Sequence, residues 1–232
     1  MFIANSMTKD VVVIQPEAGL LEAKEKMENH RIHSLPVVKA DNTLVGIVTD
    51  RDVRSAMPSG LLGEKESYKE IERLARIKIK DIMTKKPVTI SPAQTLEDAL
   101  LMMQSMRVGA FPVVDKGNKL KGIITKRDLL RAFINVLGIE EPGTLLCILA
   151  ENKLGTMKKI VDAISEERIP FGSILVARYW EEGKRAVFAY LLTQNVVKVK
   201  RKLQKLGFTL LNPLEWYLDQ LPARREEKEN KN

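Results

Sequence analysis

The chain has 232 residues, of which 44% are hydrophobic and 29% charged, so it is too apolar for a disordered chain and long enough for one large or two smaller domains. Its single cysteine, Cys147, excludes an intramolecular disulfide framework and any zinc site built on several thiolates. The formal net charge of +8 favours anionic partners. No apolar run reaches the roughly 18 residues of a membrane span, so we expect a soluble cytoplasmic protein.

The positive charge is unevenly distributed along the chain. Residues 1–53 carry a net charge of −2, whereas residues 143–213 carry +6. The basic balance is therefore mainly a property of the last third of the sequence.

An internal repeat dominates the first 135 residues. Met7-Thr8-Lys9 recurs as Met83-Thr84-Lys85, at an offset of 76 residues. Further pairs matched at this offset without a gap are Pro16/Pro92, Leu20/Leu96, Ala23/Ala99, Met27/Met103, Arg31/Arg107, Gly46/Gly122, Thr49/Thr125, Arg51/Arg127 and Asp52/Asp128. Chance does not give so many matches in one register.

Each repeat predicts the element order β-α-β-β-α. In the first repeat we expect a strand at Val11–Ile14, followed by a helix whose buried face carries Leu20, Ala23 and Met27. Two strands follow, at Leu35–Val38 and Leu44–Val48, with a turn at Ala40-Asp41-Asn42 between them. A second helix begins at Asp50. Acidic residues in the first turn of that last helix suit the helix dipole.

The repeated pattern resembles the CBS domain, and two copies in tandem resemble a CBS pair, or Bateman module. The resemblance rests on the segment His30 to Val38 and on the doubled ending that contains Thr49-Asp50-Arg51-Asp52 and Thr125-Lys126-Arg127-Asp128. We expect CBS repeat 1 at residues 1–57, a connector helix within 58–80 and CBS repeat 2 at 81–136.

The repeated turn has groups that suit a nucleoside phosphate. A helix N-terminus offers backbone N–H groups to phosphate, and an Asp carboxylate can accept hydrogen bonds from both ribose hydroxyls. The family resemblance implies ribose contacts from Asp52 and Asp128 and phosphate or sugar contacts from Thr49 and Thr125. Arg51 and Arg127 suit phosphate by their planar fork, although a solvated helix start explains them equally well.

The two clefts are not expected to be identical. The segment containing His33 is also similar to the nucleotide-sensing subunit of AMP-activated kinase, which implies a phosphate contact from His33, whereas the second repeat has Gly109 there. Lys126 replaces Asp50 and favours a polyphosphate at the second repeat. Whether one or both clefts are occupied stays open. The His30 and His33 spacing, without a third ligand, does not indicate a metal site.

The C-terminal third predicts a second fold. Strands are expected at Thr144–Ala150, Ser173–Arg178, Arg185–Leu192 and Phe208–Leu211, and helices at Gly155–Arg168 and Val196–Leu206. This βαββαβ order is ferredoxin-like. With the segment around Gly155 it resembles the ACT domain, which implies an effector loop containing Asn152, Leu154 and Gly155. We assign residues 143–213 to this ACT-like domain and 214–232 to a partly disordered tail.

The overall fold class is thus α/β (α+β), and a CBS pair followed by an ACT-like domain resembles the acetoin-utilisation type of CBS protein. We expect no catalytic residue, metal or cofactor, because no nucleophile lies beside a base. Cys147, in an apolar strand, is expected to be a buried structural thiol.

The expected function is regulatory. The CBS pair is expected to bind an adenine nucleotide (AMP, ADP or ATP) or S-adenosylmethionine, and the ACT-like domain to dimerise or sense a second effector. A homodimer and a regulated enzyme or transporter are the expected partners. The alternative is a nucleic-acid-binding regulator that uses Lys198, Arg201, Lys202 and Lys205 on the helix at 196–206, although such a stripe is more often a solvated face.

Overall fold

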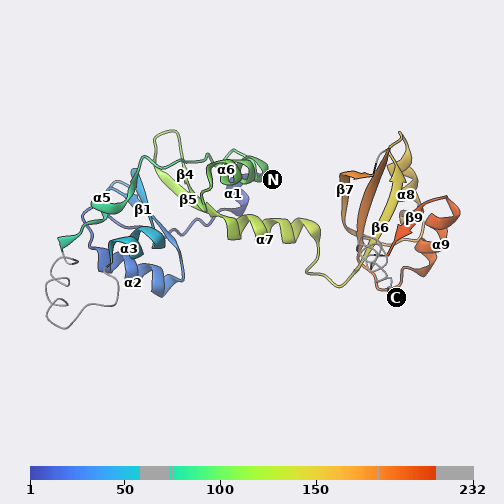
Figure 1. Ribbon diagram of the computed structural model, residues 1–232, viewed down its shortest axis with the longest axis horizontal. Helices are drawn as coiled ribbons and strands as arrows, with labels where there is room; N and C mark the ends of the chain where they lie inside the picture. The colour runs from blue at the N-terminus through green and yellow to red at the C-terminus, as the bar shows by residue number, and fades with distance from the viewer. Residues whose placement is uncertain (58–73, 75, 182, 213–232) are drawn as a thin grey trace, which may run out of the picture. The chain divides into compact units, whose positions relative to one another are not determined.

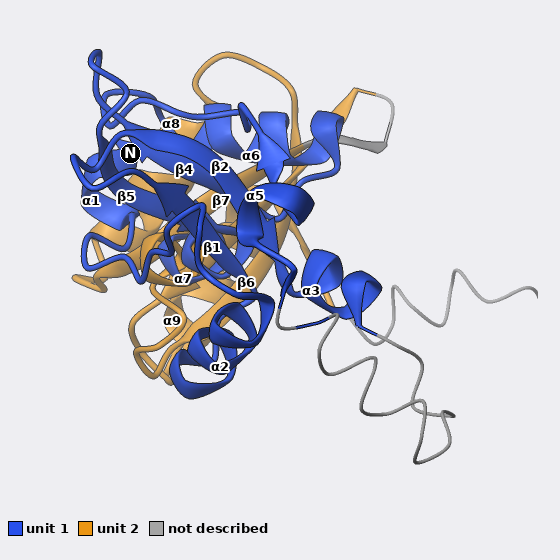
Figure 2. Ribbon diagram, turned by 90° about the vertical axis from the view of Figure 1, so that its left-hand side faces the viewer, with its two compact units in different colours: residues 1–132 blue, residues 133–232 orange. Residues whose placement is uncertain are grey.

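The computed structural model describes residues 1–57, 74, 76–181 and 183–212, and it divides into two compact units, Met1–Ala132 and Phe133–Asn232. Figure 2 colours these units separately, and their boundary falls within helix α7. Most of the connector expected within 58–80 and all of the tail at 214–232 lie outside the described residues. Among the helices of the described part, none is both long and apolar enough to cross a bilayer.

Unit 1 contains the two repeats (Figure 1). Its elements are α1 (Ile3–Ser6), α2 (Leu20–His30), β1 (Ser34–Val38), β2 (Leu44–Thr49), α3 (Asp50–Ala56), α5 (Ile79–Ile82), β3 (Thr84–Lys85), α6 (Leu96–Met106), β4 (Ala110–Val114), β5 (Leu120–Thr125) and α7 (Lys126–Leu137). The predicted helix faces are confirmed, because Leu20, Ala23 and Met27 of α2, and Leu96, Ala99 and Met103 of α6, are all buried.

The first strand expected in each repeat is much shorter than predicted. Ile14 makes only an isolated parallel bridge with Val37, and Ile90 makes the equivalent bridge with Val113. Pro16, two residues after Ile14, has no backbone N–H with which to extend the pairing. The pairing of this segment with its repeat is therefore a single bridge rather than a ladder.

The two repeats exchange their N-terminal segments. Ile3 is fully buried in the hydrophobic core of the second repeat, and Ile79, its counterpart at the 76-residue offset, is fully buried in the core of the first. The Thr8 N–H donates to the Ile123 carbonyl at 2.9 Å, and strand β3 pairs with β2. Each repeat thus completes the other, which the division at 1–57 and 81–136 did not anticipate.

Two glycines allow these exchanged segments to pass close to the sheets. A Cβ atom at Gly46 would lie 2.5 Å from the Met83 sulfur, and one at Gly122 would lie 2.6 Å from the Met7 sulfur and 2.8 Å from the Thr8 carbonyl oxygen. The close approach explains why both repeats have glycine at this position.

The two β-turns join the repeats on another side. Asn42 and Asn118 adopt left-handed backbone conformations, with φ of 63° and 58°. The Asn42 side-chain amide donates to the Leu120 carbonyl, and that of Asn118 donates to the Leu44 carbonyl, each at 2.9 Å. Leu44 and Leu120 are buried with Val38 between the repeats. The two repeats are therefore also joined by apolar contacts and by hydrogen bonds from their turns.

Unit 2 has the element order β-α-β-β-α-β. After the end of α7, its elements are β6 (Thr144–Glu151), α8 (Thr156–Ser165), β7 (Phe171–Glu181), β8 (Lys184–Leu191), α9 (Val197–Lys205) and β9 (Thr209–Leu211). The antiparallel sheet has the strand order β7-β8-β6-β9. Each element falls within a few residues of its predicted position.

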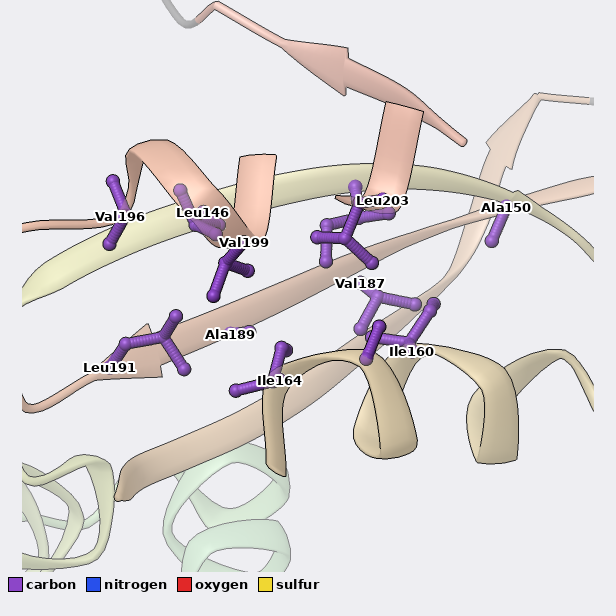
Figure 3. Packing of buried hydrophobic residues seen from close by; sticks show 12 residues of the cluster. Leu146, Ala150, Ile160, Ile164, Val187, Ala189, Leu191, Val196, Val199 and Leu203 are labelled. Carbon is purple, nitrogen blue, oxygen red and sulfur yellow. The ribbon is translucent and has the colours of Figure 1, made fainter. Parts of the chain in front are cut away.

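The core of unit 2 lies between the sheet and its two helices (Figure 3). Ile160 and Ile164 of α8, and Val199 and Leu203 of α9, are fully buried against strand residues that include Val187. Two of the sequence predictions concern residues of unit 2, Leu206 and Cys147. Leu206, predicted as the last residue of the second helix, is 50% exposed and lies just past the end of α9 at Lys205. Cys147 is buried as predicted, and its burial raises the pKa of the thiol.

Candidate functional site

The repeated turns form the same hydrogen-bonded cap in both repeats. The Thr49 N–H and hydroxyl donate to Oδ2 of Asp52 at 2.8 and 2.7 Å, and the Asp52 N–H donates back to the Thr49 hydroxyl at 3.3 Å. In the second repeat Thr125 makes the corresponding bonds to Asp128 at 2.9, 2.6 and 3.3 Å. This reciprocal pattern is a capping box, which satisfies N–H groups at the start of α3 and α7.

These caps leave part of each carboxylate available. Oδ2 of Asp52 and of Asp128 is used by its threonine, whereas Oδ1 accepts no hydrogen bond from the residues the structure describes. The hydroxyl hydrogens of Thr49 and Thr125 are engaged by the carboxylates. A ligand phosphate at either threonine would therefore compete with an internal hydrogen bond, whereas a ligand hydroxyl could reach Oδ1 freely.

A cavity of about 810 Å³ lies between the two repeats. Its lining comes from the N-terminal segment, the end of α2 and the turn after it, and the two cap regions. The lining residues are Thr8, Asp10–Val12, His30–Ser34, Thr49, Asp50, Gly109, Ala110, Ile123, Thr125–Asp128 and Arg131. This volume falls in the range of small-molecule sites.

Six of the eight residues predicted for the nucleotide site come together in this cavity. The first repeat contributes His33 and Thr49, and the second contributes Thr125, Lys126, Arg127 and Asp128. Asp128 is only 8% exposed, so its carboxylate is a buried charged group at the wall.

The other two predicted residues, Arg51 and Asp52, do not line the cavity. The wall includes Asp128 but not its counterpart, and the exchange of segments does not cause this difference, because Thr84 pairs with Ile47 just as Thr8 pairs with Ile123. The cavity is therefore built around Asp128 rather than Asp52, although the two residues are equivalent in sequence.

The sequence did not identify several lining residues. Arg131 had a usable signal, because it follows Arg127 by four residues and so shares a face of α7. Arg31, in a left-handed conformation with φ of 51°, had none, and neither did Thr8 and Asp10. These last two reach the cavity only through the exchange of N-terminal segments.

Asp50 is paired with side chains of the first repeat. Its Oδ2 atom lies 2.8 Å from an Arg54 guanidinium nitrogen and 3.4 Å from Nδ1 of His33. The same residues line a second hollow of about 600 Å³ next to α2 and α3. The His33 side chain is 84% exposed, and the residues that the structure describes include no group of three potential metal ligands.

The predicted effector loop of unit 2 is only partly at a cavity. Asn152 lines a hollow of about 320 Å³ at the start of α8, whereas Leu154 is fully exposed and does not line it. Gly155, which also lies outside the lining, adopts φ of 83° and precedes the helix.

The basic stripe on α9 is partly neutralised within unit 2. Lys202 forms ion pairs with Glu166 and, at 3.6 Å, with Glu167. These contacts raise the pKa of Lys202. The described residues around α9 add no observation in favour of nucleic-acid binding.

Comparisons with known proteins identify the family of the two repeats. The family model of the CBS domain matches residues 3–59 and 79–135. A CBS domain-containing protein of Dictyostelium discoideum is 36% identical over 137 residues, which cover 59% of this chain and 94% of that protein.

Two solved structures extend the comparison. The structure of an acetoin utilization protein (AcuB) from Vibrio cholerae shares 28% identity and has a TM-score of 0.50, covering 61% of this chain and 98% of that one. A Methanocaldococcus jannaschii protein, described as an archaeal homologue of γ-AMPK, shares 29% identity and has a TM-score of 0.51, covering 57% of this chain and 47% of that one.

Proposed function

This chain belongs to the CBS-domain family, and from that membership we propose that it is a regulatory protein whose CBS pair binds an adenine nucleotide or a related adenosyl compound. The observation that carries the proposal is the cavity between the repeats. It combines a buried carboxylate, Asp128, with a helix N-terminus and three cations of α7, Lys126, Arg127 and Arg131. A ribose diol and a phosphate need these groups close together.

The mechanism we propose is linkage between the ligand and the arrangement of the repeats. The cavity wall is drawn from both repeats, so a change in their relative position changes the ligand's contacts. A ligand that binds one arrangement more tightly shifts the equilibrium by its differential affinity. In this proposal the protein itself carries out no reaction, and a regulated enzyme or transporter in the cytoplasm responds to the shift.

For unit 2 we propose an ACT-like role in homodimer formation or in binding a second small effector. Support comes from its βαββαβ order, the strand order β7-β8-β6-β9 and the position of Gly155 directly before α8. Sedimentation of the full chain at several concentrations tests the dimer. A monomer at every concentration contradicts it.

Calorimetry with AMP, ADP, ATP and S-adenosylmethionine tests the nucleotide site. We expect Asp128→Ala to abolish measurable binding in the cavity, because it removes the carboxylate that faces the ribose. Asp98→Ala is the matched control: Asp98 caps α6 through Thr95 with bonds of 2.9 and 3.1 Å, but it does not line the cavity. Absence of binding by all four compounds, or equal binding by both variants, contradicts the assignment.

A further inference from the structure

The start of α7 carries positive charge that the protein does not neutralise. Lys126 and Arg127 occupy the first turn of this 12-residue helix, and Arg131 follows one turn later. All three line the cavity, and none of their side chains has an ion pair or hydrogen bond with the residues the structure describes. In the first turn Lys126 and Arg127 oppose the helix dipole, whereas Asp128 suits it, so a bound anion would offset the remaining unfavourable charge.

The equivalent helix of the first repeat has the opposite character. Its first turn contains Asp50 and Asp52, which suit the dipole, with Arg51 between them, and Asp50 is paired with Arg54. Ser55 occupies the position equivalent to Arg131 at the 76-residue offset. Lys126 and Arg131 are therefore properties of the second repeat alone and not a requirement of the fold, whereas Arg127 has a counterpart in Arg51.

The acidic residues around the cavity leave this cationic side available. Asp10, Asp50 and Asp128 also line the wall. The charge of Asp50 is balanced by Arg54, which leaves Asp10 and Asp128 as two negative charges against the three cations of α7. Arg31, from the first repeat, adds a fourth cation to the lining. The positive charge thus faces the cavity from α7 and from the turn after α2.

We infer that the cavity selects adenine nucleotides with a di- or triphosphate, and that Lys126, Arg127 and Arg131 are the residues that set this specificity. The inference rests on the proposed function and narrows its ligand class. Each added phosphate supplies charge to unpaired cations, and charge-assisted hydrogen bonds are about twice as strong as neutral ones. A sulfonium ligand such as S-adenosylmethionine places positive charge beside these residues and is disfavoured.

Calorimetry on the full chain at one fixed salt concentration tests the inference. We expect ATP to bind at least about tenfold more tightly than AMP, and S-adenosylmethionine to bind most weakly. Arg131→Ser and Lys126→Ser should each lower ATP affinity by about tenfold and affect AMP less. Both residues are exposed, so the variants are expected to fold.

Lys116→Ser is the matched control, because Lys116 is an exposed lysine of the same repeat that does not line the cavity. The inference is overturned if AMP or S-adenosylmethionine binds as tightly as ATP, or if Arg131→Ser and Lys126→Ser bind ATP as Lys116→Ser does. Either result leaves the nucleotide site itself standing. Binding of none of these compounds instead refutes the proposed function.

Discussion

The two repeats of unit 1 have the same framework but different charges at the cavity. Each begins with a segment that is buried in the other repeat, and each ends in a Thr–Asp cap at a helix start. At the residue after the cap threonine, however, the first repeat has Asp50 and the second has Lys126. The features that the two repeats share stabilise the fold, whereas the difference in charge places the unpaired cations at one side of the cavity.

The exchanged segments give the largest expected effect. Ile3→Ala and Ile79→Ala each remove a fully buried side chain and should each destabilise unit 1 by about 2–5 kcal/mol. Denaturant unfolding followed by circular dichroism or hydrogen exchange measures this, because both tryptophans lie in the C-terminal third and do not report on unit 1. A loss of stability in Ile79→Ala alone would show that only one of the two exchanged segments stabilises unit 1.

The close approach at the glycines gives the next effect. Gly122→Ala and Gly46→Ala should each cost about 1–3 kcal/mol, because the new Cβ atom overlaps a methionine sulfur and approaches a backbone oxygen. The backbone oxygen is nearer at Gly122 (2.8 Å) than at Gly46 (3.0 Å), so we expect the larger loss at Gly122. Thermal unfolding of both variants checks the order, and unchanged stability at either position rules out the close approach there.

The caps give a smaller effect on stability. Variants of the two cap threonines also separate an effect on folding from an effect on binding. Thr49→Ala and Thr125→Ala should each destabilise by about 1 kcal/mol, because each removes an N-cap oxygen. Both threonines line the cavity, but only Thr125→Ala also frees Oδ2 of Asp128, so we expect the larger change in nucleotide affinity from this variant. Unfolding and calorimetry on the same two variants measure both effects. An equal change in affinity would show that Asp128 is not the dominant contact of the nucleotide.

The ion pair between the turns gives the smallest effect, and it depends on pH. Lys119 donates to Asp41 at 2.6 Å and lowers the pKa of that carboxyl far below its ordinary 3.8. A lowered pKa contributes stability above the ordinary value, and this is lost as pH falls through the folded-state value. Lys119→Met should therefore weaken unit 1 at neutral pH.

The difference from the unaltered protein should shrink in acid, as measured by unfolding midpoints at several pH values. Lys116→Met, at an exposed neighbouring position, is the control and should show no such pH dependence. A Lys119→Met effect that is equal at all pH values would show that the ion pair does not link the repeats.

Much of the fold could be predicted from the sequence because its signals are local. The helix faces of α2 and α6 follow the spacing of apolar residues, and the elements of unit 2 fall within a few residues of their expected bounds. The signal failed at Val11–Ile14, where β-branched residues predict a strand but the structure forms only one bridge. The strand propensity of a segment does not determine how many backbone hydrogen bonds a neighbouring strand forms with it.

The sequence alone determined the repeat, the caps and the charge difference between Asp50 and Lys126, because each depends on residue type and spacing within a few residues. Only the tertiary structure decided which cap the cavity surrounds. The 76-residue offset makes Asp52 and Asp128 equivalent, and the pairings of Thr8 with Ile123 and of Thr84 with Ile47 are equivalent as well, so only the folded chain shows that the cavity wall includes Asp128 and not Asp52. Contacts between segments more than 100 residues apart leave no local pattern, so Thr8 and Asp10 became visible as cavity residues only in the folded chain.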